Sequence, residues 1–365
     1  EGYVRKGLSG IKSGLSYKEV DAKNIQIFKE LYSKLWKPIK SELKSVDKVF
    51  ISPDGILNLF PFGALIDSEE KFLLENMEIA YLTNGRELIG VEGEVFKSQG
   101  ELLLLANPAY DLKVASTSTS VTSLRSIDFT GGFTPLPGTQ IEADEIPALI
   151  MSKDKNITVL TGKEATEEEI KKSKSPRIMH LATHGFFLKD EEITPSNNTR
   201  GLSIVDLGPD MGTKNYAKRY ENPLVRSGLA FAGANHASEV TKGEDGILTA
   251  LEVSGLDLYG TDLVVLSACE TGVGEIKNGE GVFGLRRAFA LAGAKNLMMS
   301  LWPVSDEITA RQMITFYKNL QKLPPAKALR QAQLQTIKEL KAKYGFAPIV
   351  LWAPFILQGA EAFNN

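Results

Sequence analysis

The chain has 365 residues, 43% of them hydrophobic, and its formal net charge at pH 7 is −3. This length can bury the core of one large domain or of two modest ones. Acidic and basic residues are mixed along the chain, which excludes the basic footprint typical of a nucleic-acid-binding protein. We find no signal peptide and no apolar run of membrane-spanning length, so we expect a soluble, cytoplasmic protein without a membrane partner. The single cysteine, Cys269, excludes an internal disulfide framework.

The first predicted element is an amphipathic helix over residues 20–44. Its apolar residues recur at steps of three and four from Ile25 to Leu43, as on one face of a helix. Pro38 should kink this helix or split it in two. We assign residues 1–45 to a tail and this helix, which is either the remnant of a helical repeat region or a helix that packs against the following sheet.

Short strands and turns follow this helix. A strand is predicted at 49–52, ahead of a Pro-Asp-Gly turn, and the apolar run in "ELLLLANPAY" predicts another. The stretch "ITVLTGKEATEEEI" is typical of a strand followed by a helix, with Thr166 and Glu169 spaced as a capping box. Two polar segments, 115–132 and 189–222, are predicted to be loops.

Strands and helices alternate in the rest of the chain. Apolar runs predict strands at 178–183, 262–268 and 296–302. Amphipathic patterns predict helices at 282–291 and 307–322, and a further helix that ends near Lys343. Continuous apolar strands between amphipathic helices are typical of an α/β fold, with a mostly parallel sheet covered by helices on both faces. We treat residues 46–365 as one domain, with an N-terminal half at 46–165 and a catalytic half at 166–365.

Two strand ends carry the candidate chemistry. In open α/β sheets, functional groups lie beyond the carboxyl ends of the strands. His184 follows the strand at 178–183, and Cys269 follows the strand at 262–268. If these strands are neighbours, the Cys269 thiolate can attack a carbonyl carbon while His184 carries the protons. The backbone N–H groups of Gly185 and Cys269 could together form an oxyanion hole.

Other interpretations of these residues stay open at this point. A lone cysteine after an apolar strand is often a buried residue without a reactive role. His180 and His184 suggest a zinc site, but residues four apart in a strand lie more than about 10 Å apart, which is too far for one ion. The zinc-helix motif also has glutamate where this chain has Leu181. We therefore predict no metal and no cofactor, and interpret His180 as a packed residue of the sheet.

Several motifs occur in a fixed order along the chain: "ISPDGILNLFPFGAL", "FTPLPGTQIEADEI", "HLATHGFF", "DLVVLSACETGVGE", "GEGVFGLRRAFALAGAKNLMMSLWPVSDEITARQMITFY" and "LWAPFILQG". Together they resemble the CHAT family, which is similar to caspases, separase and gingipains and is often found behind tetratricopeptide repeats. The resemblance covers about residues 46–360. It implies a caspase-like fold with a His-Cys dyad at the strand ends. By position, His184 would be the general acid and base, Cys269 the nucleophile, and Gly185 a contributor to the oxyanion hole.

The resemblance also implies where a substrate binds. Ser300, Leu301 and Trp302 would form the sheet edge that receives the substrate as an added strand, through backbone hydrogen bonds. Asp306 would meet a basic side chain, which would favour cleavage after Arg or Lys. As an alternative, Asp306 could cap the helix that begins at Glu307.

These observations predict a cysteine endopeptidase that cuts protein or peptide substrates and is regulated by a partner, such as a tetratricopeptide-repeat or sensor region. If cleavage follows basic residues, Arg125 and Arg200, in the two polar loops, are candidate self-processing sites. The resemblance implies substrates in bacterial defence, such as gasdermin-like pore formers. The alternative function is a non-catalytic caspase-like scaffold that binds extended peptides. A serine hydrolase is poorly supported, because the chain lacks a G-x-S-x-G elbow.

Overall fold

A computed structural model describes residues 17–89, 100–113, 132–150, 156–187, 223–225, 227–240, 243–267, 280–302 and 305–364. The two predicted polar loops, 115–132 and 189–222, lie outside these residues except for Gly132. Cys269, Arg125 and Arg200 also lie outside them.

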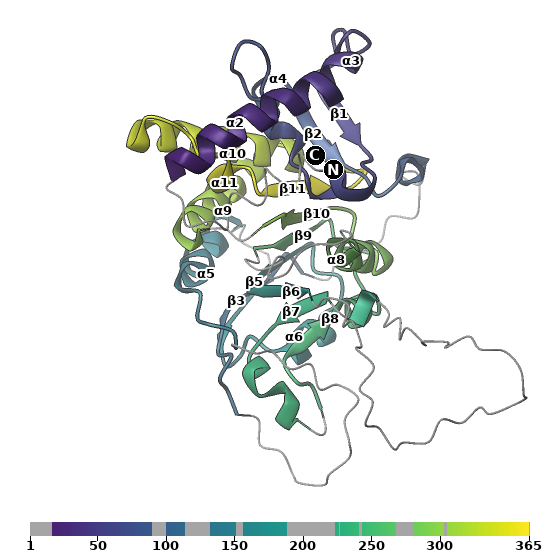
Figure 1. The fold of residues 1–365 in the computed structure, drawn as a ribbon. Helices are drawn as coiled ribbons and strands as arrows, with labels where there is room; N and C mark the ends of the chain where they lie inside the picture. The colour runs from purple at the N-terminus through teal and green to yellow at the C-terminus, as the bar shows by residue number, and fades with distance from the viewer. Residues whose placement is uncertain are drawn as a thin grey trace, which may run out of the picture.

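The main sheet has eight strands in the order β1-β2-β11-β10-β9-β5-β3-β4 (Figure 1). Every neighbouring pair is parallel except β10 and β11, so the predicted mostly parallel sheet is confirmed. The strands are β1 (Lys48–Ile51), β2 (Glu78–Tyr81), β3 (Leu102–Pro108), β4 (Ile157–Gly162), β5 (Ile178–Ala182), β9 (Leu263–Leu266), β10 (Leu297–Ser300) and β11 (Phe355–Gln358).

A second, smaller sheet lies next to the carboxyl end of β5. Its three antiparallel strands are β6 (His184–Phe187), β7 (Ser227–Ala230) and β8 (Ile247–Thr249). The chain passes from one sheet to the other at Thr183, whose hydroxyl donates a hydrogen bond to the carbonyl of Ala230. His184 is therefore the first residue of a new strand, for which the sequence had predicted no element.

The helices agree with the predicted pattern in the second half of the chain. They are α2 (Tyr17–Leu31), α3 (Lys37–Lys40), α4 (Leu73–Asn76), α5 (Pro137–Ile150), α6 (Glu167–Lys172), α7 (Ala250–Val253), α8 (Glu280–Leu291), α9 (Asp306–Leu320), α10 (Pro325–Tyr344) and α11 (Ile349–Trp352). Short 3-10 turns lie at Gly55–Leu59, Phe62–Ala64, Gly85–Ile89, Pro223–Val225 and Ala234–Glu239. Thr166 caps α6 as predicted, because its hydroxyl accepts a hydrogen bond from the N–H of Glu169. The Glu169 carboxylate pairs with Lys172.

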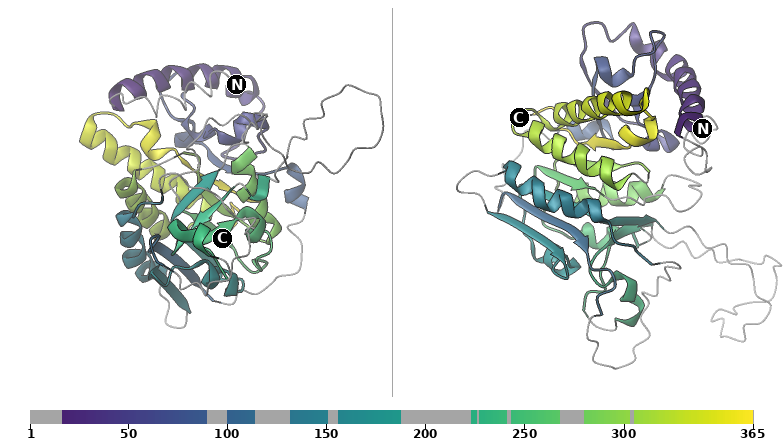
Figure 2. Two further views of the ribbon diagram at one scale, coloured as in Figure 1. Left: turned by 60° about the horizontal axis from the view of Figure 1, so that its bottom comes forward. Right: turned by 90° about the vertical axis from the view of Figure 1, so that its left-hand side faces the viewer.

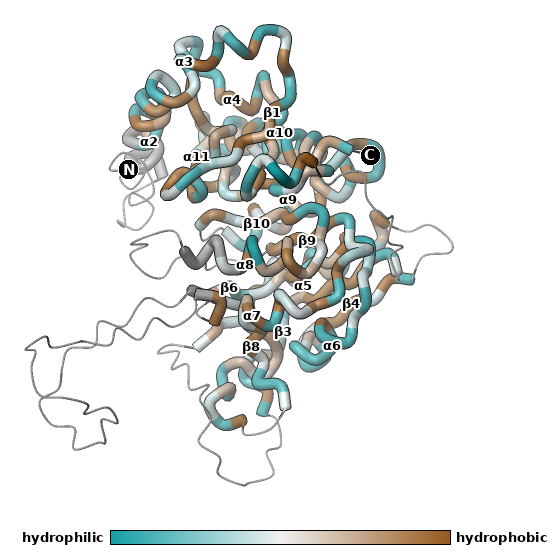
Figure 3. Tube along the Cα trace, turned by 90° about the vertical axis from the view of Figure 1, so that its right-hand side faces the viewer, coloured by the Kyte–Doolittle hydropathy of each residue, from teal (hydrophilic) through white to brown (hydrophobic). Residues whose placement is uncertain are grey.

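Helices cover both faces of the main sheet, as predicted. Alternate residues of a strand point to opposite faces. In β5, Ile178 and Ala182 belong to a buried cluster with side chains of α5, α9 and α10. Met179 and Leu181 belong to a second cluster with side chains of α6, α7 and α8. The right-hand view of Figure 2 shows α5, α9 and α10 side by side on the first face, and in Figure 3 the outer helix α6 is mostly hydrophilic.

The N-terminal helix packs onto the domain and changes its winding near Pro38. Between α2 and α3 the chain forms a π-helix, Tyr32–Trp36, because Pro38 has no N–H and its ring crowds the preceding turn. The sequence therefore predicts the break correctly. Phe28 is buried against Phe60, with ring centroids 5.1 Å apart, and burial of one such side chain contributes about 1.5–3 kcal/mol. Hydrophilic and hydrophobic residues alternate along α2 in Figure 3.

Candidate active site

The two strands that lead to the predicted dyad are neighbours, which is the condition that the dyad requires. β5 and β9 pair in parallel, with Leu181 in register with Leu266. The N–H of Ser267, just after β9, donates a hydrogen bond of 3.0 Å to the carbonyl of Leu181. Both strands therefore deliver their following residues to the same edge of the sheet. Cys269 comes two residues after Ser267 in the sequence and lies outside the described residues.

His184 is held in a buried setting made by segments far away in the sequence. Its ring packs against the rings of Tyr110 and Phe133, with centroid distances of 5.2 and 5.6 Å. Its Nε2 donates a hydrogen bond of 2.7 Å to the carbonyl of Thr134. The Tyr110 hydroxyl lies 3.0 Å from the hydroxyl of Thr183, the residue before His184. These contacts fix the orientation of the imidazole.

The same contacts determine which nitrogen of His184 can exchange a proton. A carbonyl oxygen only accepts hydrogen bonds, so Nε2 carries its proton and the lone pair of the neutral ring is on Nδ1. Nδ1 is buried, and no hydrogen-bond partner for it is found in the described part of the chain. A buried imidazole nitrogen with a free lone pair can take a proton from a thiol and return it to an amine.

Gly185 follows His184 in β6 and is in register with Leu229 of β7. Along one strand of an antiparallel ladder, alternate residues direct their N–H groups to opposite sides. The predicted oxyanion role requires that the N–H of Gly185 points away from β7. The absence of a side chain at this position leaves its backbone open to close approach.

Ser300, Leu301 and Trp302 do not lie on an outer strand of the sheet, so the expected edge position is wrong, while their role in binding a substrate stays a prediction. β10 lies between β9 and β11, and the N–H of Leu301 donates a hydrogen bond of 2.9 Å to the carbonyl of Pro354. The physical reason is that the apolar segment at the end of the chain supplies β11, which covers the side expected to be open. β10 does extend beyond its last pairing with β9, at Met299. The Trp302 indole N–H donates to the carbonyl of Val350 and its side chain is buried.

Asp306 binds a helix other than its own. Its carboxylate accepts a hydrogen bond of 2.5 Å from the N–H of Gly138, in the first turn of α5, where free N–H groups and the helix dipole favour a negative charge. A side chain at position 138 would collide with this carboxylate, which explains the glycine. The alternative that Asp306 caps its own helix is wrong, because α9 begins at Asp306 and Ser305 is its N-cap residue.

His180 is completely buried, in agreement with its interpretation as a packed residue. Its Nε2 lies 2.8 Å from Glu142 Oε2, and its Nδ1 lies 3.0 Å from the hydroxyl of Tyr317. Glu142 Oε1 also accepts a hydrogen bond of 2.9 Å from Ser267. The sequence did not predict these partners, which come from α5, α9 and the end of β9.

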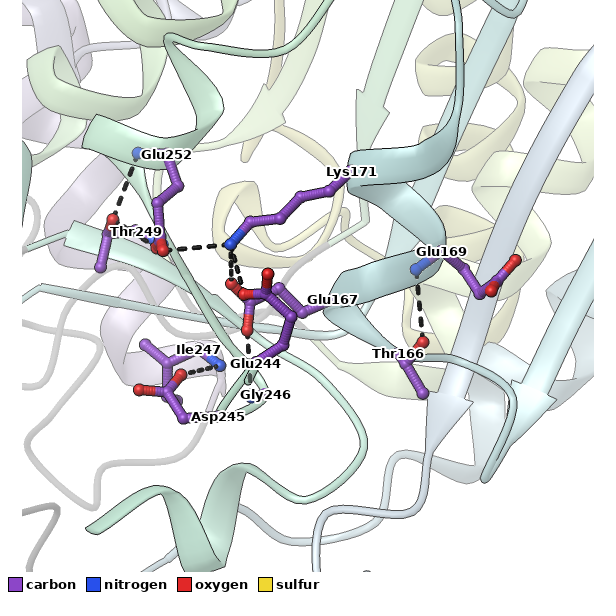
Figure 4. Close-up of polar contacts among 10 residues, drawn as sticks. All are labelled: Thr166, Glu167, Glu169, Lys171, Glu244, Asp245, Gly246, Ile247, Thr249 and Glu252. Atoms are coloured by element: carbon purple, nitrogen blue, oxygen red, sulfur yellow. Dashed lines mark hydrogen bonds and ion pairs between the residues drawn. The ribbon is translucent and has the colours of Figure 1, made fainter. Parts of the chain in front are cut away.

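A second, partly buried polar cluster lies where α6 meets β8 (Figure 4). The Lys171 ammonium lies 2.6 Å from Glu167, 2.5 Å from Glu244 and 3.1 Å from Glu252. The spacing of these three carboxylates would allow them to hold a metal ion. The Lys171 ammonium, however, occupies the position that the metal ion would take. Burial raises the pKa of Glu167 to about 8, although the hydrogen bond from Lys171 opposes this shift. Glu167 Oε2 also accepts from the N–H of Gly246, next to β8.

The sequence predicted His184 but not the residues that hold it. Thr134 acts through its backbone carbonyl, which no side-chain pattern reveals. Tyr110 and Phe133 flank a long polar segment and carry no periodic signal of their own. The quoted stretch "FTPLPGTQIEADEI", which includes Phe133 and Thr134, was the one available indication that this region is important.

Comparisons with known proteins show the family to which the chain belongs. The family model of the CHAT domain matches residues 26–360, so the match begins inside α2. Tetratricopeptide repeat protein 28 of Homo sapiens is 26% identical over 234 residues, which are 63% of this chain and 9% of that protein. The same protein of Mus musculus is also 26% identical over 234 residues. The chain therefore spans a small part of the length of these curated relatives.

Two solved structures align with most of the chain at low identity. The Arg specific cysteine proteinase gingipain R aligns with a TM-score of 0.47 and 10% identity, over 99% of this chain and 74% of its own. A chain of the Saccharomyces cerevisiae separase-securin complex aligns with a TM-score of 0.41 and 12% identity, over 83% of this chain and 14% of its own. Within the described residues, no helix is both long and apolar enough to cross a membrane.

Proposed function

The chain belongs to the CHAT domain family, and on this premise we propose that it is a cysteine endopeptidase with a dyad of His184 and Cys269. The observation that carries the proposal is the state of His184. One ring nitrogen is bound to the Thr134 carbonyl, and the other is buried without a hydrogen-bond partner among the described residues. This is the arrangement that a general base needs, since the ring is oriented and one nitrogen can still accept a proton.

In the proposed reaction, the Cys269 thiol gives its proton to His184 Nδ1, and the thiolate attacks the carbonyl carbon of the peptide bond. A C–S bond forms, and the negative charge on the former carbonyl oxygen is stabilised by the N–H groups of Gly185 and Cys269. When the C–N bond breaks, His184 returns the proton to the leaving amine. His184 then takes a proton from the water that attacks the thioester, the C–S bond breaks, and His184 returns the proton to the leaving thiolate, which gives the acid product and the free thiol.

The proposed specificity is for a basic residue before the cut, with Asp306 as its counter-charge. In the structure this carboxylate already binds the N–H of Gly138, so an arginine would approach a charge that is anchored to the start of α5. An anchored carboxylate loses little conformational freedom when it meets a guanidinium, which favours a bidentate pair. The backbone of residues 300–302 is the proposed strand for the substrate, beyond the last pairing of β10 with β9.

Regulation and partners are proposed from the family and the relatives. The curated relatives carry tetratricopeptide repeats in their names, so a repeat or sensor region is the proposed regulator. The proposed location is the bacterial cytoplasm, and the proposed substrates are gasdermin-like pore-forming proteins that act in bacterial defence. Arg125 and Arg200 remain the proposed self-processing sites.

The test is cleavage of a diverse peptide pool by the wild type and by Cys269→Ala, with products read by mass spectrometry. We expect products with the wild type alone, most of them cut after Arg or Lys. Asp306→Asn should lower the preference for basic residues by about 10-fold or more, as loss of a charged partner costs about 1.5–3 kcal/mol. Equal products from the wild type and Cys269→Ala would contradict the dyad. Binding of peptides without cutting, unchanged in Cys269→Ala, would favour the scaffold.

A further inference from the structure

Four polar side chains form one buried network beneath the proposed dyad. Glu142 comes from α5, His180 from β5, Tyr317 from α9, and Ser267 from the end of β9. All four are almost fully buried. They therefore join two neighbouring strands of the sheet to two helices on the same face.

Every donor in the network has one acceptor. Burial and the nearby Glu142 carboxylate raise the pKa of Tyr317 well above its usual range, so its hydroxyl keeps its proton and donates to His180 Nδ1. His180 then carries its own proton on Nε2 and donates it to Glu142 Oε2. The Ser267 hydroxyl donates to the other oxygen, Oε1. The two halves of the Glu142 carboxylate thus bind the two strands that lead to the dyad.

Such a network is costly for a core position. In the described part of the chain, Glu142 has no lysine or arginine partner at ion-pair distance, and His180 is its one titratable donor. A buried ionic group often contributes no more stability than an apolar group of the same size, and its benefit is then a defined geometry. The geometry defined here is the spacing between β5 and β9 at the edge where both strands end.

The start of α5 also supplies the other contacts of the site. The carbonyl of Thr134, just before the helix, binds His184, and the N–H of Gly138 binds Asp306. Glu142 lies one turn further along. One short segment therefore contacts the proposed base, the proposed specificity residue, and both strands.

We infer that Glu142 is a positioning residue, which sets the distance between His184 and Cys269 by holding His180 and Ser267 on its two carboxylate oxygens. This inference rests on the proposed dyad. Glu142 touches neither the substrate nor the reacting atoms. Its loss should therefore misplace the two reacting groups relative to each other without changing how a peptide binds.

The single cysteine allows a test that does not depend on the substrate. Because Cys269 is the only thiol, the rate of alkylation by iodoacetamide across a pH series reports its thiolate, which is the reactive form. We expect Glu142→Gln and Ser267→Ala to lower this rate at neutral pH by about 10- to 100-fold, the usual cost of a misplacement of about 1 Å. The midpoint of alkylation should move to higher pH, and kcat for peptides should fall with KM nearly unchanged.

Two further variants complete the design. Tyr317→Phe removes one hydroxyl from the far end of the network and should have the same effect in a weaker form. Thr336→Val removes a buried hydroxyl that bonds to its own helix, α10, and should leave the alkylation profile unchanged. If Glu142→Gln does not fold, Ser267→Ala carries the test, because it deletes a single small donor.

Two results would overturn the inference, and they can be told apart. Folded Glu142→Gln and Ser267→Ala proteins with the wild-type alkylation profile would overturn it alone, provided that His184→Ala shifts the profile. An identical profile in the wild type and His184→Ala would overturn the proposed dyad, and the positioning role with it.

Discussion

The surroundings of His180 and of His184 differ in the number of ring nitrogens that form hydrogen bonds, and our proposal of a structural and a reactive histidine rests on this difference. Both rings are buried, and both belong to the same short stretch of chain. His180 uses both nitrogens, one toward Glu142 and one toward Tyr317. His184 uses one nitrogen, toward the Thr134 carbonyl, and keeps the other free within the described residues. This difference is the basis for the proposal that His184, and not His180, exchanges a proton in the reaction.

The largest expected effect comes from removal of the reactive ring. His184→Ala should lower peptidase activity by about 10²- to 10⁴-fold, the usual contribution of a positioned general base. Peptide hydrolysis measures this, and His236→Ala is the matched control because His236 is a partly exposed histidine that pairs with Glu239. An unchanged rate in His184→Ala would remove the distinction between the two rings.

The structural ring should matter most for stability. His180→Leu leaves the buried Glu142 carboxylate without its main donor, and we expect a loss of about 3–5 kcal/mol in the free energy of unfolding. Urea unfolding measures this loss. The double variant Glu142→Leu/His180→Leu should recover much of it, since no buried charge remains. A loss below about 1 kcal/mol in the single variant would show that the Glu142 carboxylate does not depend on His180 for its stability in the core.

The cluster around Lys171 should make the stability of the protein depend on pH, independently of the His180 network. The pKa of Glu167 is raised to about 8, so between about pH 4.5 and pH 8 the folded protein binds a proton that the unfolded chain releases. Stability is therefore greater below this window and falls as pH rises through it. We expect a fall on the order of 1–3 kcal/mol between pH 5 and pH 9.

Glu167→Gln should flatten this dependence, because glutamine cannot lose the proton. Urea midpoints at pH 5, 7 and 9 measure the difference between the variant and the wild type. Glu168→Gln is the control, since Glu168 is exposed and pairs with Lys172 at the surface. Equal pH slopes in the wild type and Glu167→Gln would refute the assignment.

The smallest effect is expected at the cap of α6. Thr166→Ala removes the hydroxyl that accepts from the N–H of Glu169 and should cost about 1 kcal/mol of stability. Peptidase activity should stay at the wild-type level, because α6 lies on the opposite face of the sheet from the His180 network. A loss of activity out of proportion to the loss of stability would connect the two regions.

The sequence predicted those parts of the fold that have long, regular patterns. The apolar runs in β5 and β9, and the amphipathic pattern of α9, were sufficient to predict their types and to place His184 and Cys269 each after a strand, and the structure shows that the two strands are neighbours. β6 (HGFF) and β7 (SGLA) were missed because polar residues and glycine interrupt them, and β8 (ILT) has three residues, so none shows the continuous apolar run that marks β5 and β9.

The contacts of the site were less predictable than its residues. The Thr134 carbonyl and the Gly138 N–H act through the backbone, so their residue types carry no signal. Asp306 looked like a local helix cap or a pocket residue, and its bond to Gly138 depends on the packing of α5 against α9. The edge predicted at Ser300 failed because β11 returns antiparallel to cover β10, and local patterns do not fix such long-range pairing.

The most direct measurement is covalent labelling by a peptidyl electrophile that carries arginine next to the reactive carbon, followed by intact mass. The wild type should gain one adduct, located on Cys269, and His184→Ala should gain it at least about 10²-fold more slowly. Equal labelling rates in the two proteins would contradict a dyad of His184 and Cys269.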